Sequence, residues 1–234
     1  MSAPRSARER VREEVTGEIL AVARTHLARD GAPLLSLRSI ARDLEMAPSA
    51  LYRYFSSRDA LLSALILSAY ESLADEAERA SAAAFAAEES DAARWLAVPR
   101  TMRHWALAHR HEWSLIFGTP VPGYQAPEDT VVPYARVAAA LVRPITDAEM
   151  AHSLKPGTPP VEVADGLRDA VAPVADALLG RMPIATVISA LQAWTTLIGL
   201  ISLELFGHWR NTILDPELYF EETIRSLSVS VGLV

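Results

Sequence analysis

A short run of small, aromatic and cationic side chains could bind a nucleic acid: residues 48–55 read PSALYRYF. Pro48 fixes φ and needs no amide hydrogen at the first position of a helix, so the run predicts a helix that begins there. Leu51 and Phe55 lie four residues apart on its inner face, which leaves the small and polar residues outside. Arg and Tyr bind phosphates and base edges, and small neighbours permit close approach to a duplex. The run therefore predicts a helix that enters a DNA groove.

Several side chains in and around this helix are candidates for direct contact with DNA. Tyr52 and Tyr54 are separated by about 200° around the helix axis, so their hydroxyls can reach the phosphates on opposite walls of a groove. Arg58 begins the next predicted helix, whose N-terminal dipole also favours a phosphate. Arg38 is the strongest candidate for base recognition, because Arg can bind a guanine edge through two hydrogen bonds. The predicted DNA-binding residues are Arg38, Pro48, Ser49, Ala50, Tyr52, Arg53, Tyr54 and Arg58.

The residues before this run predict a second short helix that packs against it. Four apolar residues recur at i, i+3, i+4 and i+7, namely Leu37, Ile40, Ala41 and Leu44. Ser36 is a suitable N-cap for this helix. Only residues 45–47 separate the two helices, so they must cross at a tight turn. An ordinary hairpin of amphipathic helices is the alternative, but an exposed Tyr-Arg-Tyr sequence favours DNA binding.

Residues 36–62 resemble the N-terminal helix-turn-helix of the TetR family of bacterial transcriptional regulators. The matching positions are Ile40-Ala41, Met46, Ala50-Leu51-Tyr52, Tyr54-Phe55, Arg58 and Leu61-Leu62. Farther on, residues 113–124 (WSLIFGTPVPGY) and 206–209 (FGHW) resemble the C-terminal domain of a WHG-like TetR subgroup. Glu45 departs from the family's usual Gly, and a left-handed conformation there would cost about 1–2 kcal/mol. Ala47 replaces the usual Ser or Thr cap at a cost of about 1 kcal/mol, partly offset by Pro48.

The resemblance implies an all-α protein with two domains. Residues 1–57 would form a three-helix DNA-binding domain, and residues 58–234 a larger helical domain for effector binding and dimerisation. It also implies a homodimeric repressor that binds a palindromic operator and is released by a small, largely apolar effector. Aromatic walls suit a cavity for such an effector, although core packing is the alternative for each aromatic residue. The candidate ligand-binding residues are Met102, Trp105, Trp113, Phe117, Tyr124 and Trp194.

The distribution of charge is compatible with DNA binding by one part of the chain. The 234 residues carry a net charge of −7, but residues 1–60 hold ten arginines against eight acidic residues. The basic excess coincides with the predicted DNA-binding domain, and the acidic remainder limits non-specific adhesion to DNA. The chain has no cysteine, which excludes disulfides, thiolate metal sites and cysteine catalysis. Its start has no apolar segment typical of a signal peptide, so the cytoplasm is the expected location.

The remaining sequence favours helices throughout. An apolar stripe from Val11 to Leu27 predicts a first helix that stops at Asp30-Gly31. Residues 56–59 match a capping box before a long helix that reaches about residue 86. Pro99 is expected to kink the helix that follows. Later helices are expected at about 91–109, 111–118, 130–148, 163–180, 183–206 and 215–231.

The segment 183–203 is uncharged and meets the length of about 20 residues needed for a membrane span. Its Ser, Thr and Gln residues and the lack of a flanking basic cluster argue against that alternative. A helix so apolar is instead expected to be buried. We therefore expect 183–206 and 215–231 to form the dimer interface, and we expect no membrane association.

A histidine group supplies the alternative function, a helical enzyme or metal-dependent hydrolase that uses His104, His109 and His111. His109 and His111 fall on different faces of a helix, and His104 and His109 are five residues apart rather than the four that suit shared ligation. The sequence also has no Gly-rich phosphate loop and no nucleophile elbow. We therefore expect neither enzymatic activity nor a cofactor or metal.

Overall fold

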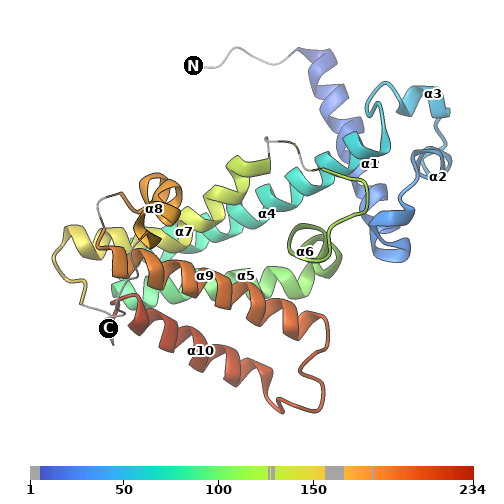
Figure 1. The fold of residues 1–234 in the computed structure, drawn as a ribbon. Helices are drawn as coiled ribbons and strands as arrows, with labels where there is room; N and C mark the ends of the chain where they lie inside the picture. The colour runs from blue at the N-terminus through green and yellow to red at the C-terminus, as the bar shows by residue number, and fades with distance from the viewer. Residues whose placement is uncertain (1–5, 126, 128–129, 156–165, 181) are drawn as a thin grey trace. The chain divides into compact units, whose positions relative to one another are not determined.

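A computed structural model describes residues 6–125, 127, 130–155, 166–180 and 182–234. The described residues form helices joined by turns, and no strand occurs among them (Figure 1). The predicted all-α class is therefore confirmed. Contacts between residues divide the chain into two compact units, one of residues 1–69 and 111–130 and the other of residues 70–110 and 131–234.

The first unit contains the N-terminal helices, the start of α4, and α6, which comes from later in the chain. Its elements are α1 (Ala7–Asp30), the short helix η1 (Ala32–Leu34), α2 (Leu37–Asp43), α3 (Pro48–Leu51), the beginning of α4 (Arg58–Ala86) and α6 (Arg110–Phe117). Buried aliphatic residues such as Ile19, Ile40, Leu51 and Leu61 form its core. The expected domain boundary at residue 57 lies just before α4, whereas the compact units divide within that helix.

The second unit is built from longer helices around buried tryptophan and aliphatic side chains. Its elements are the remainder of α4, α5 (Asp91–Ala108), α7 (Val131–Met150), α8 (Leu167–Val174), the π-helical segment η3 (Ala175–Leu179), α9 (Ile184–Leu205) and α10 (Pro216–Ser230). Helix α5 contacts α7, α9 and α10. Arg103 joins α5 to Glu204 of α9 through two hydrogen bonds of 2.8 Å, and Arg100 joins α5 to Glu221 of α10. The ion pairs fix the register of these helices because each Arg presents two parallel donors to one carboxylate.

Most helix positions agree with the sequence-based expectation. Helix α4 covers 58–86 as expected. Its cap differs from the expected box over residues 56–59, because Ser57, not Ser56, accepts a hydrogen bond through its Oγ from the Ala60 amide at 3.0 Å. The helix expected over 163–180 differs: residues 163–165 lie outside the described residues, and the rest divides into α8 and η3. Pro99 lies inside α5, which continues through it to residue 108.

Helix α9 is the only described helix that is long and apolar enough to cross a membrane. Only 33% of its most apolar 18-residue window is buried within this chain. The core side of the helix includes Leu197 and Leu200, which are both buried, whereas Leu203 is exposed. The expected helix is therefore present, but it is only partly buried within a single chain, and burial of the rest in a dimer interface stays a prediction.

Candidate DNA-binding interface

Helix α2 is anchored by the residues that the sequence predicted for its inner face. Leu37, Ile40 and Ala41 are buried, while Arg38 and Arg42 are exposed. The Ser36 Oγ accepts a hydrogen bond from the Ser39 amide and caps the helix. The inner face therefore packs into the first unit and leaves Arg38 accessible to a partner.

The turn between α2 and α3 has the strain that the sequence predicted. Glu45 adopts φ of 54°, the left-handed conformation that glycine usually occupies. Ala47 caps α3 without a side-chain hydrogen bond, and Pro48 takes the first helical position. Backbone hydrogen bonds from Met46 to the Ala41 carbonyl (2.8 Å) and from Leu44 to the Ile40 carbonyl (3.0 Å) hold the turn closed. The tight crossing of the two helices forms despite the unfavourable residue types.

Helix α3 presents a small and polar face to solvent. It is only four residues long, and residues 52–54 continue it as a turn. Leu51 and Phe55 are buried as expected, whereas Ser49, Tyr52 and Arg53 are exposed. Pro48 is exposed and Ala50 is half-buried. The outer face is thus the combination of side chains that can approach base edges and phosphates.

A hollow of about 650 Å³ lies between the start of α1 and the α3 region. Three arginines line it, Arg8 and Arg12 from α1 and Arg53 from the turn after α3. The Arg12 guanidinium lies 5.8 Å from the centre of the Tyr54 ring, within the range of a cation–π contact. Because arginine charges from two separate elements face one hollow, the hollow suits a phosphate backbone.

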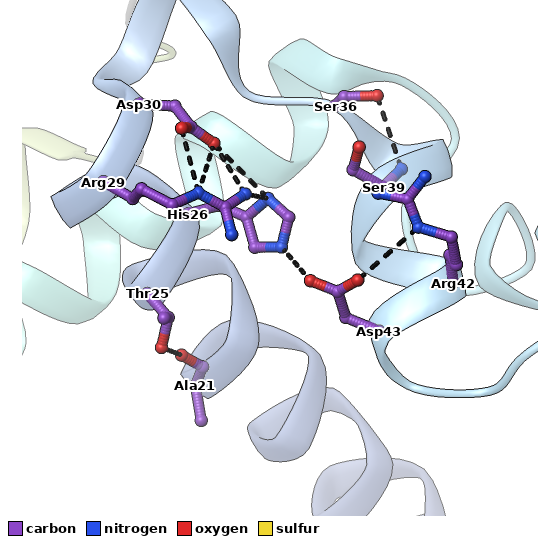
Figure 2. A network of polar contacts seen from close by, with 9 residues as sticks. All are labelled: Ala21, Thr25, His26, Arg29, Asp30, Ser36, Ser39, Arg42 and Asp43. Atoms are coloured by element: carbon purple, nitrogen blue, oxygen red, sulfur yellow. Dashed lines mark hydrogen bonds and ion pairs between the residues drawn. The ribbon is translucent and has the colours of Figure 1, made fainter.

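Helix α1 is tied to α2 by a polar network around a buried histidine (Figure 2). His26 is 2% exposed, and its Nε2 lies 2.7 Å from Oδ2 of Asp43 at the end of α2. Its Nδ1 lies 3.2 Å from Nη2 of Arg29, whose guanidinium also binds Asp30. The hydrogen bond from His26 is the largest cause that holds the Asp43 pKa below its usual value, although burial opposes it. Sequence reasoning missed this network because Asp43, which joins α2 to it, lies 17 residues from His26.

Arg58 at the start of α4 has partners inside the first unit. Its Nη2 donates to the carbonyl oxygens of Ala32 at 2.8 Å and Pro33 at 3.3 Å, which lie in η1. The guanidinium also lies 3.5 Å from Asp59. These contacts support the connection between α1 and α2, and a phosphate contact by Arg58 stays a prediction.

Helix α6 and the segment after it also pack within the first unit. Arg24 of α1 lies 3.2 Å from Glu112 of α6 and donates a 2.7 Å hydrogen bond to Ser68 of α4. The Tyr124 hydroxyl lies 2.9 Å from Oγ of Ser63, which itself donates to the Asp59 carbonyl. Because the serine hydrogen is already used, Tyr124 is the donor in this pair. These contacts join residues 111–130 to the helices that carry the candidate interface.

The comparisons with known proteins match this arrangement. Residues 19–65 match the family model described as bacterial regulatory proteins, tetR family, and residues 95–227 match that of the tetracyclin repressor-like C-terminal domain. An HTH-type transcriptional regulator of Mycobacterium tuberculosis and another of Mycobacterium bovis are each 37% identical over 233 residues, covering 94% of this chain and 93% of theirs. The chain belongs to the TetR family of transcriptional regulators.

Solved structures share the fold of this chain. The crystal structure of the protein SCO4313 has a TM-score of 0.74 with 36% identity, and the match covers 96% of this chain and 98% of that chain. A protein of unknown function from Rhodococcus sp. RHA1 has a TM-score of 0.67 with 27% identity, covering 93% of this chain and 94% of that one. A regulatory protein of the tetR family from Rhodococcus RHA1 shares the fold at 17% identity, with a TM-score of 0.59, covering 94% of this chain and 97% of that one.

The candidate ligand-binding residues of this TetR-family chain fall into both units. Met102, Trp105 and Trp113 are buried, Phe117 packs against Trp113 in a tilted arrangement with ring centres 4.5 Å apart, and Tyr124 forms a hydrogen bond with Ser63. In the second unit, Trp105 donates a 3.0 Å hydrogen bond to Ser72. Trp194 lines an apolar cavity. The assignment of these residues to a ligand stays a prediction, and Trp194 is the member that the cavity supports.

The three histidines of the alternative function lie in different surroundings. The His109 ring stacks on Trp105, with centres 4.8 Å apart, while His104 and His111 are exposed. Within the part of the chain that the structure describes, no three His, Asp or Glu side chains gather to hold a metal ion. The described geometry therefore gives the metal-dependent alternative no support.

Proposed function

We propose that this TetR-family regulator is a repressor that binds a palindromic operator as a homodimer and is released by a small, largely apolar effector. The observation that carries the DNA-binding half of the proposal is the exposed face of α3 beside the arginine-lined hollow. The exposed face of α3 provides short side chains for close approach to bases, and the hollow provides positive charge for phosphates. Such a protein works where the chromosome is, which in bacteria is the cytoplasm.

The residues divide into two roles in this proposal. Arg38 and Arg53 are exposed, so each has a guanidinium available for a base edge or its neighbourhood. Ser49 and Ala50 are short, which permits the backbone of α3 to approach the bases. The hydroxyls of Tyr52 and Tyr54 donate hydrogen bonds to phosphates. These phosphate contacts give affinity and orientation, while Arg38 supplies most of the sequence preference.

The homodimer is proposed to form through α9 and α10, which contact each other within one chain. Three apolar side chains support this surface because they are exposed in the single chain: Leu203 of α9 and Leu218 and Val229 of α10. Leu197 and Leu200 point into the core of the same subunit and are therefore unsuitable as interface probes. A two-fold axis through these helices would place two DNA-binding units against the two half-sites of a palindrome.

Mobility-shift titration of an operator, obtained by selection from random duplexes, tests this function. We expect binding to fall steeply with salt, because each neutralised phosphate contributes about 0.9 to the slope of log K against log salt. Arg12→Ala should reduce that slope by about one unit. Arg79→Ala, an exposed arginine of α4 in the second unit, is the matched control and should leave the slope unchanged. Selection that yields no preferred sequence would overturn the proposal.

A separate measurement addresses the alternative enzymatic function. Metal analysis of the purified protein should give no stoichiometric metal if the chain is only a regulator. One metal per chain, lost on substitution of His104 and His109 together, would instead favour the metal-dependent hydrolase.

A further inference from the structure

An apolar, partly open cavity lies in the second unit between α7, η3 and α9. Its volume is about 110 Å³. Nine side chains from these helices and the end of α8 form its walls: Tyr134, Ala138, Leu141, Val142, Val174, Leu178, Ala190, Leu191 and Trp194. The η3 wall is π-helical, a wide turn that is frequent at functional sites.

The walls contain hydroxyl and indole groups but no charged side chain. The indole Nε1 of Trp194 donates a 3.0 Å hydrogen bond to the Tyr134 hydroxyl. Since that hydroxyl oxygen accepts from Trp194, its own hydrogen is oriented away from the indole and can be donated to an acceptor on a ligand. A charged ligand would lose its hydration without gaining a counter-ion, so the lining selects an uncharged one.

Edge-to-face contacts hold this polar pair in place. The Tyr134 ring lies 5.6 Å from the Trp194 ring and 5.8 Å from the Tyr70 ring, at interplanar angles of 86° and 82°. Burial is the largest cause that raises the pKa of Tyr70 to about 12. A rigid aromatic wall with a single hydrogen-bond donor orients a ligand through one polar atom.

The volume limits the size of the ligand. An apolar protein cavity of about 150 Å³ stays dry and accommodates benzene. A cavity of about 110 Å³ therefore holds no more than one ring, and the exposed lining residues Tyr134 (36%) and Val174 (38%) mark the side through which a substituent can extend. Drug-sized ligands occupy pockets of about 300–1,000 Å³ and do not fit here.

We propose that this cavity binds an uncharged ligand of about one ring that presents a single hydrogen-bond acceptor to Tyr134. The inference rests on the proposed function, because it names the class of effector for that regulator. It makes Trp194 and Tyr134 the ligand-contacting aromatic residues of the second unit, with the apolar residues of α7 and α9 enclosing the ring.

Calorimetric titration of the full chain with phenol, toluene and benzoate tests the inference. Phenol should bind at one site per chain, toluene more weakly, and benzoate not at all. Ala190→Leu fills the cavity from α9 and should weaken phenol binding by about tenfold or more, while the melting temperature stays equal or rises. Ala185→Leu, the same change at an exposed position of α9, should leave phenol binding unchanged.

Tyr134→Phe is a second variant that keeps the aromatic ring and removes the hydroxyl, which is the proposed donor to the ligand and the acceptor of the hydrogen bond from Trp194. It should bring phenol affinity down to that of toluene and leave toluene affinity unchanged. The inference is overturned if neither neutral compound binds, if benzoate binds as tightly as phenol, or if Ala190→Leu and Tyr134→Phe both bind phenol like the wild type. Operator binding measured on the same protein separates the two failures: intact DNA binding without ligand binding rejects this inference alone, whereas loss of selective DNA binding rejects the regulator.

Discussion

The buried imidazole of His26 lies 2.7 Å from the Asp43 carboxylate and thereby joins α1 to the end of α2 within the first unit (Figure 2). The carboxylate accepts, so Nε2 carries a hydrogen and Nδ1 can accept from Arg29 at 3.2 Å. Nδ1 also lies 3.9 Å from Oδ2 of Asp30. Since α2 carries Arg38 and packs against α3, this contact connects the stability of the first unit to the position of Arg38.

Acid should weaken this connection. The Asp43 pKa is lowered, chiefly by the His26 hydrogen bond, so its stabilising contribution is present above the unfolded pKa of about 3.9 and is lost as pH falls through the lower folded value. We expect Asp43→Asn to lower the urea midpoint at pH 7, and the difference from wild type to shrink below about pH 4. Glu71→Gln, at an exposed position of α4, is the control and should not alter the midpoint at pH 7. An equal difference at pH 3 and pH 7 would contradict the role of the Asp43 charge.

Tyr52→Phe and Tyr54→Phe should each weaken binding to all DNA sequences similarly, because each removes one phosphate hydrogen bond. The loss per hydroxyl should be about 0.5–1.5 kcal/mol, the usual net contribution of such a bond. Tyr54→Phe keeps the ring under Arg12, so its effect isolates the hydroxyl from the cation–π contact. Competition with non-specific DNA is the measurement, and a loss confined to one base position would assign the tyrosine to base recognition instead.

Arg38→Ala should cost about 1–3 kcal/mol on the preferred operator and relax the preference at one base position. The side chain is exposed on α2, so the change leaves the core intact. Arg42→Ala is the matched control, since Arg42 is exposed on the same helix and lies 3.7 Å from Asp43. Equal preference profiles for wild type and Arg38→Ala would restrict Arg38 to the phosphate backbone.

The sequence predicted what depends on local periodicity and missed what depends on distant partners. Apolar spacing located α4 at 58–86, and Glu45 took the left-handed conformation expected at a position where the TetR family usually has Gly. In contrast, the contact of Arg58 with the Ala32 carbonyl joins residues 26 positions apart, and no local pattern encodes it. The aromatic spacing likewise could not separate Trp194, which lines a cavity, from Trp113, which is in the core. Both outcomes depend on which helices meet in three dimensions.

A charge on the exposed surface of α9 should separate the proposed homodimer. Leu203 is 43% exposed in the single chain, so Leu203→Glu places the carboxylate in water when the chain is alone and buries it, unpaired, when α9 meets a second copy. Obligate interfaces often bury more than about 2,000 Å² in total, and an unpaired charge within one is strongly destabilising. We expect a monomer in analytical ultracentrifugation with unchanged helical content, and operator affinity reduced to that of one half-site.

Two further variants make this prediction decisive. Val132→Glu introduces the same charge at an exposed position of α7, outside the proposed surface, and should remain dimeric. Leu200→Glu should unfold the chain, because Leu200 is buried within the subunit, and this result would separate loss of folding from loss of assembly. A dimeric Leu203→Glu variant with native operator affinity would show that the two copies meet through helices other than α9. Protein that requires detergent to stay in solution would instead indicate that the uncovered apolar surface of α9 meets lipid, the alternative that its composition raises.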